Sequence, residues 1–340
     1  MYLGNIKGKV RSIMKVGKLD TDLLRKIVFR HITCQREEVL VRPGVGEDCA
    51  VVDFGDYACV LSTDPITGTA SEVGRLAVHI SCNDVASNGV EPLGLMLTIM
   101  APEGTTADEI EEVMRQAGEE SKKLNVEIIG GHTEITSAVN RIIVSATAIG
   151  RQIKNRVVAT CGAQVGDLVL MTKTAGLEGT AIIAHENTGV LTGYMGADMV
   201  ERAKYMMNMI SVVPEGIIGG ALGTSSMHDI TEGGLLGAAW ELCEAAGVGI
   251  EIHLKHVPIA VETEKICGYY HLDPLRLISS GCMLMTIPEE KGCELLRALE
   301  EKGIQGTVIG RITNEGRYLI DGEEKVEISP PESDELYKVV

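Results

Sequence analysis

The sequence runs Gly-Val-Gly-Glu-Asp-Cys-Ala over residues 44–50, at the start of a predicted β-strand. Two related segments follow it, Ser-Thr-Asp-Pro-Ile-Thr-Gly at residues 62–68 and Ile-Ser-Cys-Asn-Asp-Val-Ala at residues 80–86. Each places an aspartate at or near the end of an apolar run. Such carboxylates can hold Mg²⁺, and neighbouring glycines let backbone N–H groups approach phosphate oxygens. The three segments therefore indicate a site for the phosphates of a nucleotide.

A fourth segment, Gly-Gly-His-Thr-Glu at residues 130–134, follows the apolar run 126–129. We expect Gly130 and Gly131 to end a buried strand and to bring their backbone close to a phosphate. His132 and Thr133 are candidates to donate hydrogen bonds to phosphate oxygens or to a second substrate. The alternatives are a plain strand-ending turn and a structural histidine.

Composition limits the class of protein. A chain of 340 residues exceeds the size at which one core stops growing, so two domains are expected. No apolar run approaches the roughly 20 residues that span a bilayer. The first twenty residues carry charges throughout and do not resemble a secretory signal, so we expect a cytoplasmic protein with no membrane partner.

Charge and cysteine content exclude two further classes. A net charge of −17 argues against nucleic acid as the main partner, because no stripe of Lys or Arg offsets it. The nine cysteines stand singly, without the spacing of metal ligands, and we expect most to be buried. An anionic ligand would depend on backbone amides and Mg²⁺ for much of its attraction.

Periodicity predicts alternating strands and helices and an α+β fold with two mixed domains, 1–155 and 156–340. In the first half, strands are expected at 50–53, 57–62, 93–100, 126–129 and 141–150, and helices at 23–32, 72–87 and 106–124. In the second half, strands are expected at 168–172, 226–228, 249–254, 282–287 and 307–312, and helices at 180–185, 197–209, 213–222, 234–246 and 289–301.

The second half carries its own candidate site. Asp229 ends a predicted strand, and Gly233 and Gly234 open the helix 234–246. A helix N-terminus carries free N–H groups and partial positive charge, which suit an anion. The alternative is that Asp229 or Thr231 simply caps this helix. The run Gly-Leu-Glu-Gly-Thr at residues 176–180 has the same form and is a further candidate for contact with phosphate or substrate.

These residues resemble the AIR synthase-like (PurM-like) superfamily of ATP-dependent enzymes. Seven ordered matches cover nearly the whole chain: G-x-G-x-D-x-A at 44–50, T-D at 63–64, N-D-x-A at 83–86, G-G-H-T at 130–133, D-x-T-x-G-G-L at 229–235, S-S-G at 279–281 and V-I-G-R-I-T at 308–313. The resemblance implies a homodimer in which the N-terminal domains join their strands into a shared barrel. It also implies ATP and Mg²⁺ in a groove between subunits and domains.

The resemblance assigns roles to particular residues. Asp48, Asp64 and Asp84 are the expected metal ligands and catalytic residues, with Asn83 as a neutral oxygen donor. Lys18, in a Gly-Lys pair before the first helix, is expected to reach phosphate, with a solvated lysine as the alternative. The other nucleotide-binding candidates are Gly46, Gly130, Gly131, His132, Thr133, Asp229, Gly233 and Gly234.

Within the superfamily the sequence most resembles the hydrogenase-maturation protein HypE, with three departures. Glu134 stands where HypE-like sequences have Lys, and Ser280 stands where they have Glu. The chain also ends Leu-Tyr-Lys-Val-Val, whereas HypE carries a carbamoyl group on a C-terminal Cys. The exchange of Lys for Glu reverses a charge at an expected reaction centre. We therefore expect a reaction other than HypE cyanation.

The leading hypothesis is an ATP- and Mg²⁺-dependent enzyme that phosphorylates a small molecule, or activates it by phosphorylation. Two alternatives stay open. One is a divergent hydrogenase-maturation factor that acts on a thiol of a partner protein. The other is a nucleotide-binding regulatory protein that has lost turnover. Three clustered carboxylates favour an enzyme, since a scaffold has less need of them.

Overall fold

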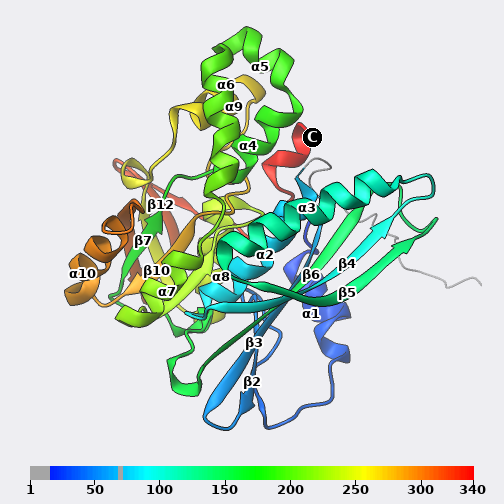
Figure 1. The fold of residues 1–340 in the computed structure, drawn as a ribbon. Coiled ribbons are helices and arrows are strands. Elements are labelled where there is room, and N and C mark those ends of the chain that lie inside the picture. Colours follow the sequence, from blue (N-terminus) through cyan, green and yellow to red (C-terminus); the bar gives the residue numbers. More distant parts are fainter. Residues whose placement is uncertain (1–15, 68–71) are drawn as a thin grey trace, which may run out of the picture.

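The computed structural model describes residues 16–67 and 72–340, which form two β-sheets with helices packed on them (Figure 1). Gly68, the last residue of the second acidic segment, lies outside the described residues. The six strands of the first sheet lie between residues 39 and 153, and the seven of the second lie between residues 168 and 327. Within the described residues, no helix combines the length and apolar character needed to cross a membrane.

The first half contains α1 (Thr21–Ile27), β1 (Val39–Val41), β2 (Ala50–Phe54), β3 (Tyr57–Ile66), α2 (Val73–Ser87), β4 (Pro92–Ala101), α3 (Ala107–Leu124), β5 (Glu127–Ile135) and β6 (Ile143–Ile153). The second half contains β7 (Leu168–Thr172), α4 (Leu177–Glu186), α5 (Thr188–Met195), α6 (Ala197–Tyr205), α7 (Val213–Leu222), β8 (Ser226–Asp229), α8 (Gly234–Ala246), β9 (Gly249–His253), α9 (Val261–Tyr270), β10 (Met283–Ile287), α10 (Glu289–Glu300), β11 (Gly306–Thr313), β12 (Arg317–Asp321) and β13 (Glu324–Glu327).

The first sheet has the order β1-β2-β3-β6-β4-β5, and α2 packs against β3 and β6. Alternate residues of these strands, such as Val60 on β3 and Ala146 on β6, are fully buried. This period of two is what a sheet covered on one face requires. Figure 1 shows α2 and α3 together on one side of the sheet. α2 is therefore buried between the sheet and the second half of the chain, where it contacts α7.

Helix α3 begins within one residue of the predicted position, because its N-terminus carries a capping box. Thr106 accepts a hydrogen bond from the N–H of Glu109, and Glu109 accepts one from the N–H of Thr106. This capping box satisfies two N–H groups that a helix end would otherwise leave free. The helix buries only a narrow stripe that includes Val113 and Ala117 against α2, which matches its amphipathic sequence.

The second sheet has the order β13-β12-β9-β11-β7-β10-β8. Its strand β10 is buried along its whole length, because helices cover both of its faces. Met283, Met285 and Ile287 belong to a cluster with residues of α7 and α10, whereas Leu284 belongs to the main core with α8. A strand buried on both faces carries a continuous apolar run, and β10 has one.

Several elements differ from the sequence-based expectation. The helix expected at 23–32 is α1 followed by a 3₁₀ turn at Phe29–His31. The strand expected at 126–129 continues through the glycines to Ile135. Two helices, α5 and α9, and three strands, β1, β12 and β13, were not predicted, because they are short and carry weak or mixed periodicity.

Candidate functional site

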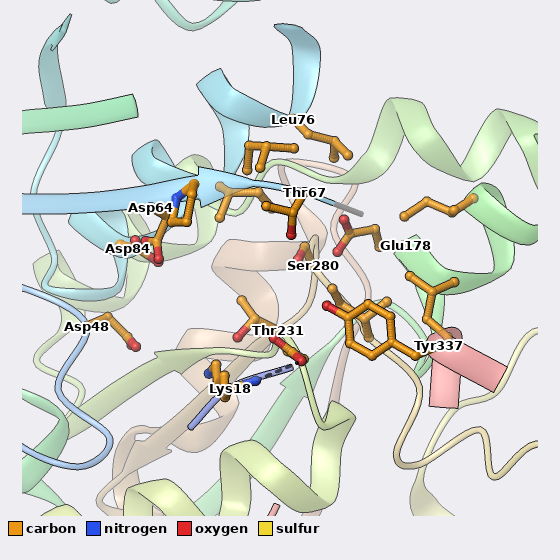
Figure 2. Close-up of a pocket in the computed structure, with 17 residues that line it drawn as sticks. Lys18, Asp48, Asp64, Thr67, Leu76, Asp84, Glu178, Thr231, Ser280 and Tyr337 are labelled. Atoms are coloured by element: carbon orange, nitrogen blue, oxygen red, sulfur yellow. Dashed lines mark hydrogen bonds between the residues drawn. The ribbon is translucent and has the colours of Figure 1, made fainter. Parts of the chain in front are cut away.

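A cavity between the two halves of the chain brings together several of the predicted site residues (Figure 2). Its empty volume is about 790 Å³, counting its open mouth. One part is apolar and the other part is strongly acidic. The lining residues are Lys18, Asp48, Asp64, Pro65, Ile66, Thr67, Leu76, Ile80, Asp84, Glu178, Ile182, Thr231, Glu232, Ile278, Ser280, Leu336 and Tyr337.

Three carboxylates converge in this cavity from separate elements. Asp48 lies in the loop before β2, Asp64 on β3 and Asp84 on α2. Figure 2 shows the carboxylates of Asp64 and Asp84 close together, because α2 packs directly on β3. The Ser62 hydroxyl lies 2.5 Å from Asp84 Oδ2 and 3.4 Å from Asp64 Oδ2. Sequence reasoning predicted this grouping.

Asp84 is the most deeply buried of the three, with 4% of its surface exposed. Burial raises its pKa well above the usual value, and the neighbouring carboxylates of Asp229, Asp64 and Asp48 raise it further. Like charges crowded in a low dielectric disfavour ionisation unless a cation offsets them. The cluster is therefore suited to binding a positive ion.

Lys18 lies at the same cavity, as its Gly-Lys context suggested. Its Nζ is 3.7 Å from Glu241 Oε1, and its backbone N–H donates to Glu232 Oε1 at 3.2 Å. Nearly half of the side chain, 44%, remains accessible. A partly exposed ammonium on a flexible stem can move to meet a phosphate that enters the cavity.

Behind Asp48 lies a buried histidine that sequence reasoning did not single out. His228 Nδ1 is 2.6 Å from Asp48 Oδ2, and His228 Nε2 is 3.3 Å from Glu241 Oε2. Burial alone lowers the pKa of His228, but these two carboxylates outweigh it and hold the pKa well above its usual value. The only signal in the sequence is its position directly before Asp229.

Position 46 requires glycine for a steric reason. Its φ is +78°, and a Cβ at this position would lie 2.5 Å from the carbonyl oxygen of Glu241. Only glycine allows the loop before β2 to pack so closely on α8. The sequence analysis expected Gly46 to approach phosphate, whereas in the structure it approaches the backbone of α8, and this contact brings Asp48 to His228.

The role expected of Asn83 is corrected by the structure. Its side chain is fully buried, and its Nδ2 donates to the carbonyl of Ile210 at 2.8 Å. Its Oδ1 accepts from the N–H of Val212, also at 2.8 Å. Asn83 thus joins α2 to the segment before α7, and its oxygen is not directed to a metal. The rotation of α2, which decides this, is set by packing that the local motif does not encode.

The start of α8 also differs from the expectation for Gly233 and Gly234. The N–H of Gly233 donates to Asp334 Oδ2 at 2.6 Å. Neither glycine lines the cavity, although Thr231 and Glu232 do. The N–H of Gly233 that was expected to meet a nucleotide phosphate is instead taken by a carboxylate of the same chain. Neither Asp229 nor Thr231 makes a side-chain cap of this helix.

The glycine segment at 130–133 lies apart from the cavity in a single copy of the chain. Gly130, Gly131, His132 and Thr133 are exposed residues within β5, the edge strand, instead of following a buried strand. A Cβ on Gly131 would lie 1.9 Å from the carbonyl oxygen of Leu97, so glycine is needed for pairing with β4. Glu134 belongs to the same exposed strand, and its carboxylate lies 3.5 Å from His132 Nε2.

Glu178 is a cavity residue in the glycine-rich turn at the start of α4. It is 3% exposed, and burial raises its pKa to about 7, an effect that neighbouring Ser280 opposes. Figure 2 shows Glu178 and Ser280 facing each other. A carboxyl group with a pKa near neutrality can take or give a proton in this pH range. The sequence analysis identified this region from its glycine turn before the helix, but it did not single out Glu178 as a proton donor or acceptor.

Comparison with known proteins finds two matching family domains and several relatives over most of the chain. Residues 46–152 match the N-terminal domain of AIR synthase related protein, and residues 164–322 match its C-terminal domain. The chain is 29% identical over 315 residues to a hydrogenase expression/formation protein of Methanocaldococcus jannaschii, covering 89% of this chain and 90% of that protein. It is 25% identical over 306 residues to carbamoyl dehydratase HypE of Rhodobacter capsulatus, covering 88% and 87%.

Solved structures share the fold. HypE from a HypE–HypF complex superposes with a TM-score of 0.75 at 21% identity, covering 91% of this chain and 99% of that chain. HypE in complex with ATP gives 0.68 at 21% identity, covering 96% and 98%. A ThiL protein complexed with AMPPCP and TMP gives 0.68 at 21% identity, covering 83% and 91%. The chain therefore has the PurM-like fold and belongs to the AIR synthase related family, with HypE-like hydrogenase-maturation proteins among its relatives.

Proposed function

We propose that the cavity binds ATP with Mg²⁺ and that the protein phosphorylates an unidentified small molecule, or activates it by phosphorylation. The observation that carries this proposal is the convergence of Asp48, Asp64 and Asp84 beside Lys18 at one end of a cavity. The relatives whose structures were solved with ATP or AMPPCP support the choice of nucleotide.

The donor set fits Mg²⁺. This ion prefers carboxylate oxygens together with phosphate oxygens, and the cavity offers three aspartates in one place. Burial and the neighbouring carboxylates raise the pKa of Asp84, so a cation bound here would stabilise its ionised form. Asp48, Asp64 and Asp84 would hold the ion, which would offset charge on the phosphates as the terminal phosphoryl group leaves. Lys18 would contact a phosphate oxygen directly.

The rest of the cavity suits the less polar parts of the ligands. Leu76, Ile80, Ile182, Ile278 and Leu336 form an apolar wall, against which a nucleobase or an apolar part of the second substrate would pack. Glu178 lies beside Ser280 in the same cavity, with a pKa of about 7. We assign Glu178 Oε1 or Oε2 as the base that accepts a proton from the acceptor oxygen when that oxygen is phosphorylated.

We also propose a homodimer through the first sheet, which would complete the groove. β5 is an edge strand of that sheet, and the side chains of Leu93, Met96, Ile129 and Ile135 on β4 and β5 are between 45% and 52% exposed. Unpaired edges and exposed apolar strands favour pairing with another chain. In this assembly, Gly130, Gly131, His132 and Thr133 of one copy would contribute to the nucleotide groove of the other. The chain would divide near residue 155 into the two expected domains.

Two other functions remain candidates on particular observations. The hydrogenase-maturation relatives favour a factor that acts on a thiol of a partner protein, and one solved relative is in complex with HypF. The exposure of Glu134 outside the cavity is compatible with either chemistry. A regulatory protein without turnover would need neither the poised Glu178 nor three metal-binding carboxylates.

The test is ATP turnover in the presence of candidate acceptors. We expect slow release of ADP by the protein with Mg²⁺ alone and faster release with the true acceptor. Asp64→Asn should abolish both rates, whereas Asp108→Asn, on the exposed start of α3, should change neither. Acceptors should include small molecules and a thiol-bearing carbamoyl-transfer partner. Tight ATP binding with no turnover under any of these conditions would support the regulatory alternative instead.

A further inference from the structure

A lysine with an unusual backbone conformation follows directly after β7. Lys173 has a φ of +54°, in the left-handed region that residues with a Cβ rarely adopt. The other described residues of this kind that are not glycine, Asn125 and His271, cap the C-termini of α3 and α9, where this conformation is common. Lys173 instead follows a strand. Its conformation therefore has another reason, which the contacts of its side chain supply.

The ammonium of Lys173 has an acceptor for each of its three protons. Its Nζ lies 2.7 Å from the carbonyl oxygen of Ser211, 2.7 Å from that of Gly281 and 2.6 Å from Glu215 Oε1. Only 12% of the Lys173 side chain and 1% of the Glu215 side chain are exposed. Burial raises the pKa of Glu215, and the charge of Lys173 opposes this rise. The two side chains therefore form a buried ion pair that also holds two backbone carbonyls.

The first of these carbonyls belongs to the segment that fixes α2. The residues on either side of Ser211 form hydrogen bonds with both ends of the Asn83 side-chain amide, each at 2.8 Å. Asn83 directly precedes Asp84, a member of the carboxylate cluster in the cavity. Lys173 is thus connected, through Ser211, to the helix that positions Asp84.

The second carbonyl is that of Gly281, in the loop that carries Ser280. Two N–H groups of the glycine turn at residues 176–179 donate to this loop, at 2.7 and 2.9 Å. That turn carries Glu178, and Figure 2 shows Ser280 and Glu178 facing each other. Lys173 is thus connected, through Gly281, to the cavity wall that these two residues form.

We propose that Lys173 is a positioning residue that fixes α2, and with it Asp84, relative to the wall that carries Glu178. The inference rests on the proposed function, in which Asp84 helps to hold Mg²⁺ and Glu178 accepts a proton from the acceptor. Phosphoryl transfer requires the phosphate and the acceptor oxygen to be held in line. Lys173 does not line the cavity, so it acts on this geometry only through the two carbonyls.

The alternative is an ion pair that contributes to stability alone. Replacing a buried ion pair by apolar residues of similar volume is often neutral or stabilising, whereas removing one partner is strongly destabilising. The double variant Lys173→Met/Glu215→Met leaves no unpaired charge, and Met keeps the unbranched side chain of lysine. The carbonyls of Ser211 and Gly281 nevertheless lose their donor. Glu215→Gln does the reverse, because it keeps the ammonium on both carbonyls but removes its counter-ion.

The two variants should show opposite patterns in urea denaturation and in ADP release with Mg²⁺. The double variant should keep its stability and its affinity for ATP, since the three aspartates remain, while kcat falls on the order of 10²-fold, as remote displacements of about 1 Å can cause. Glu215→Gln should be less stable but keep most of its kcat. If turnover follows stability in both variants, the pair is only structural and the proposal is wrong.

A matched control removes another pair of lysine and glutamate. Lys204 Nζ lies 3.0 Å from Glu201 Oε1 on α6, and neither residue lines the cavity. Lys204→Met/Glu201→Met should change neither kcat nor ATP affinity. A loss of kcat in this control as large as that in Lys173→Met/Glu215→Met would contradict a specific role for Lys173.

Hydrogen exchange tests the same connection without ATP. In the double variant at 173 and 215, the N–H groups of Gly176 and Gly179 should exchange at least ~10-fold faster, because the loop that accepts their hydrogen bonds is no longer held. Glu215→Gln and the control should leave their exchange unchanged. Equal exchange in the double variant and the unaltered chain would overturn the proposal. Faster exchange in a protein that never turns over ATP would instead refute the proposed function and leave the connection standing.

Discussion

The carboxylate of Asp334 accepts a 2.6 Å hydrogen bond from the backbone N–H of Gly233, at the start of α8. Its other oxygen accepts from the N–H groups of Ile278 and Leu336, at 3.2 and 2.8 Å. One side chain thus ties together α8, the loop before Ser279 and the 3₁₀ turn at Glu335–Lys338. That turn supplies Leu336 and Tyr337 to the cavity, so Asp334 holds one wall of the candidate site in place.

Asp334→Ala should destabilise the protein by about 2–4 kcal/mol, because three backbone N–H groups would lose a charged acceptor in a mostly buried position. Urea denaturation of the ligand-free protein measures this change. Asp321→Ala, at the exposed end of β12, serves as the control and should cost little. If Asp334→Ala lowers the free energy of unfolding no more than Asp321→Ala does, the three hydrogen bonds contribute nothing to stability.

Glu178 predicts a dependence of stability on pH. Burial raises its pKa from the ordinary 4.5 of a glutamate to about 7 in the folded protein, so the folded state holds this proton to higher pH. Between these values the unfolded state binds fewer protons, and this residue lowers the stability of the fold as pH rises. The shift corresponds to a loss on the order of 3 kcal/mol across that window.

Glu178→Gln removes this ionisation. Relative to the unaltered chain, the variant should therefore gain stability between pH 5 and pH 8, as measured by denaturation without ligands. Glu103→Gln, at an exposed turn, provides the comparison for a surface carboxylate. If the stability difference between Glu178→Gln and the unaltered chain is the same at both pH values, the carboxyl group is not buried as described.

The fold was predictable where periodicity and capping agree. The strand Leu168–Thr172 and the helices Val213–Leu222 and Gly234–Ala246 have the bounds that the sequence predicts. The sequence predicts that β5 ends at residue 129, because two glycines follow, whereas the strand continues to Ile135. Pairing with β4 overrides that local preference, since Gly131 allows close approach to Leu97.

The candidate site was predictable where a local sequence motif carries the functional residue. Asp48 lies in a loop, Asp64 on the strand β3 and Asp84 on the helix α2; packing brings the three together, and their sequence motifs predicted them. Asn83 is one residue from Asp84, but the turn of α2 directs it to Ile210 and Val212 instead. His228 and Glu178 acquire their properties from burial and from distant neighbours, which a sequence motif does not encode.

The proposed homodimer predicts about twice the chain mass in sedimentation at micromolar concentration. Ile129→Lys places a charge on the edge strand β5, where it should oppose pairing between chains and shift the protein toward the monomer. Val190→Lys, on α5, changes an equally exposed apolar side chain and should leave the dimer intact, since both residues are 52% exposed. An unaltered chain that sediments as a monomer would remove the groove between subunits from this account.

The most direct test of the account is calorimetric titration of ATP with Mg²⁺ into the unaltered chain, Asp64→Asn and Asp108→Asn. Asp64 lines the cavity, whereas Asp108 lies in the first turn of α3 outside it. We predict saturable binding to the unaltered chain and Asp108→Asn, with most affinity lost in Asp64→Asn. ATP at about 100 times its Kd should also stabilise the fold by ~2.7 kcal/mol. No binding at millimolar ATP and Mg²⁺, or equal binding by Asp64→Asn, would contradict the central claim.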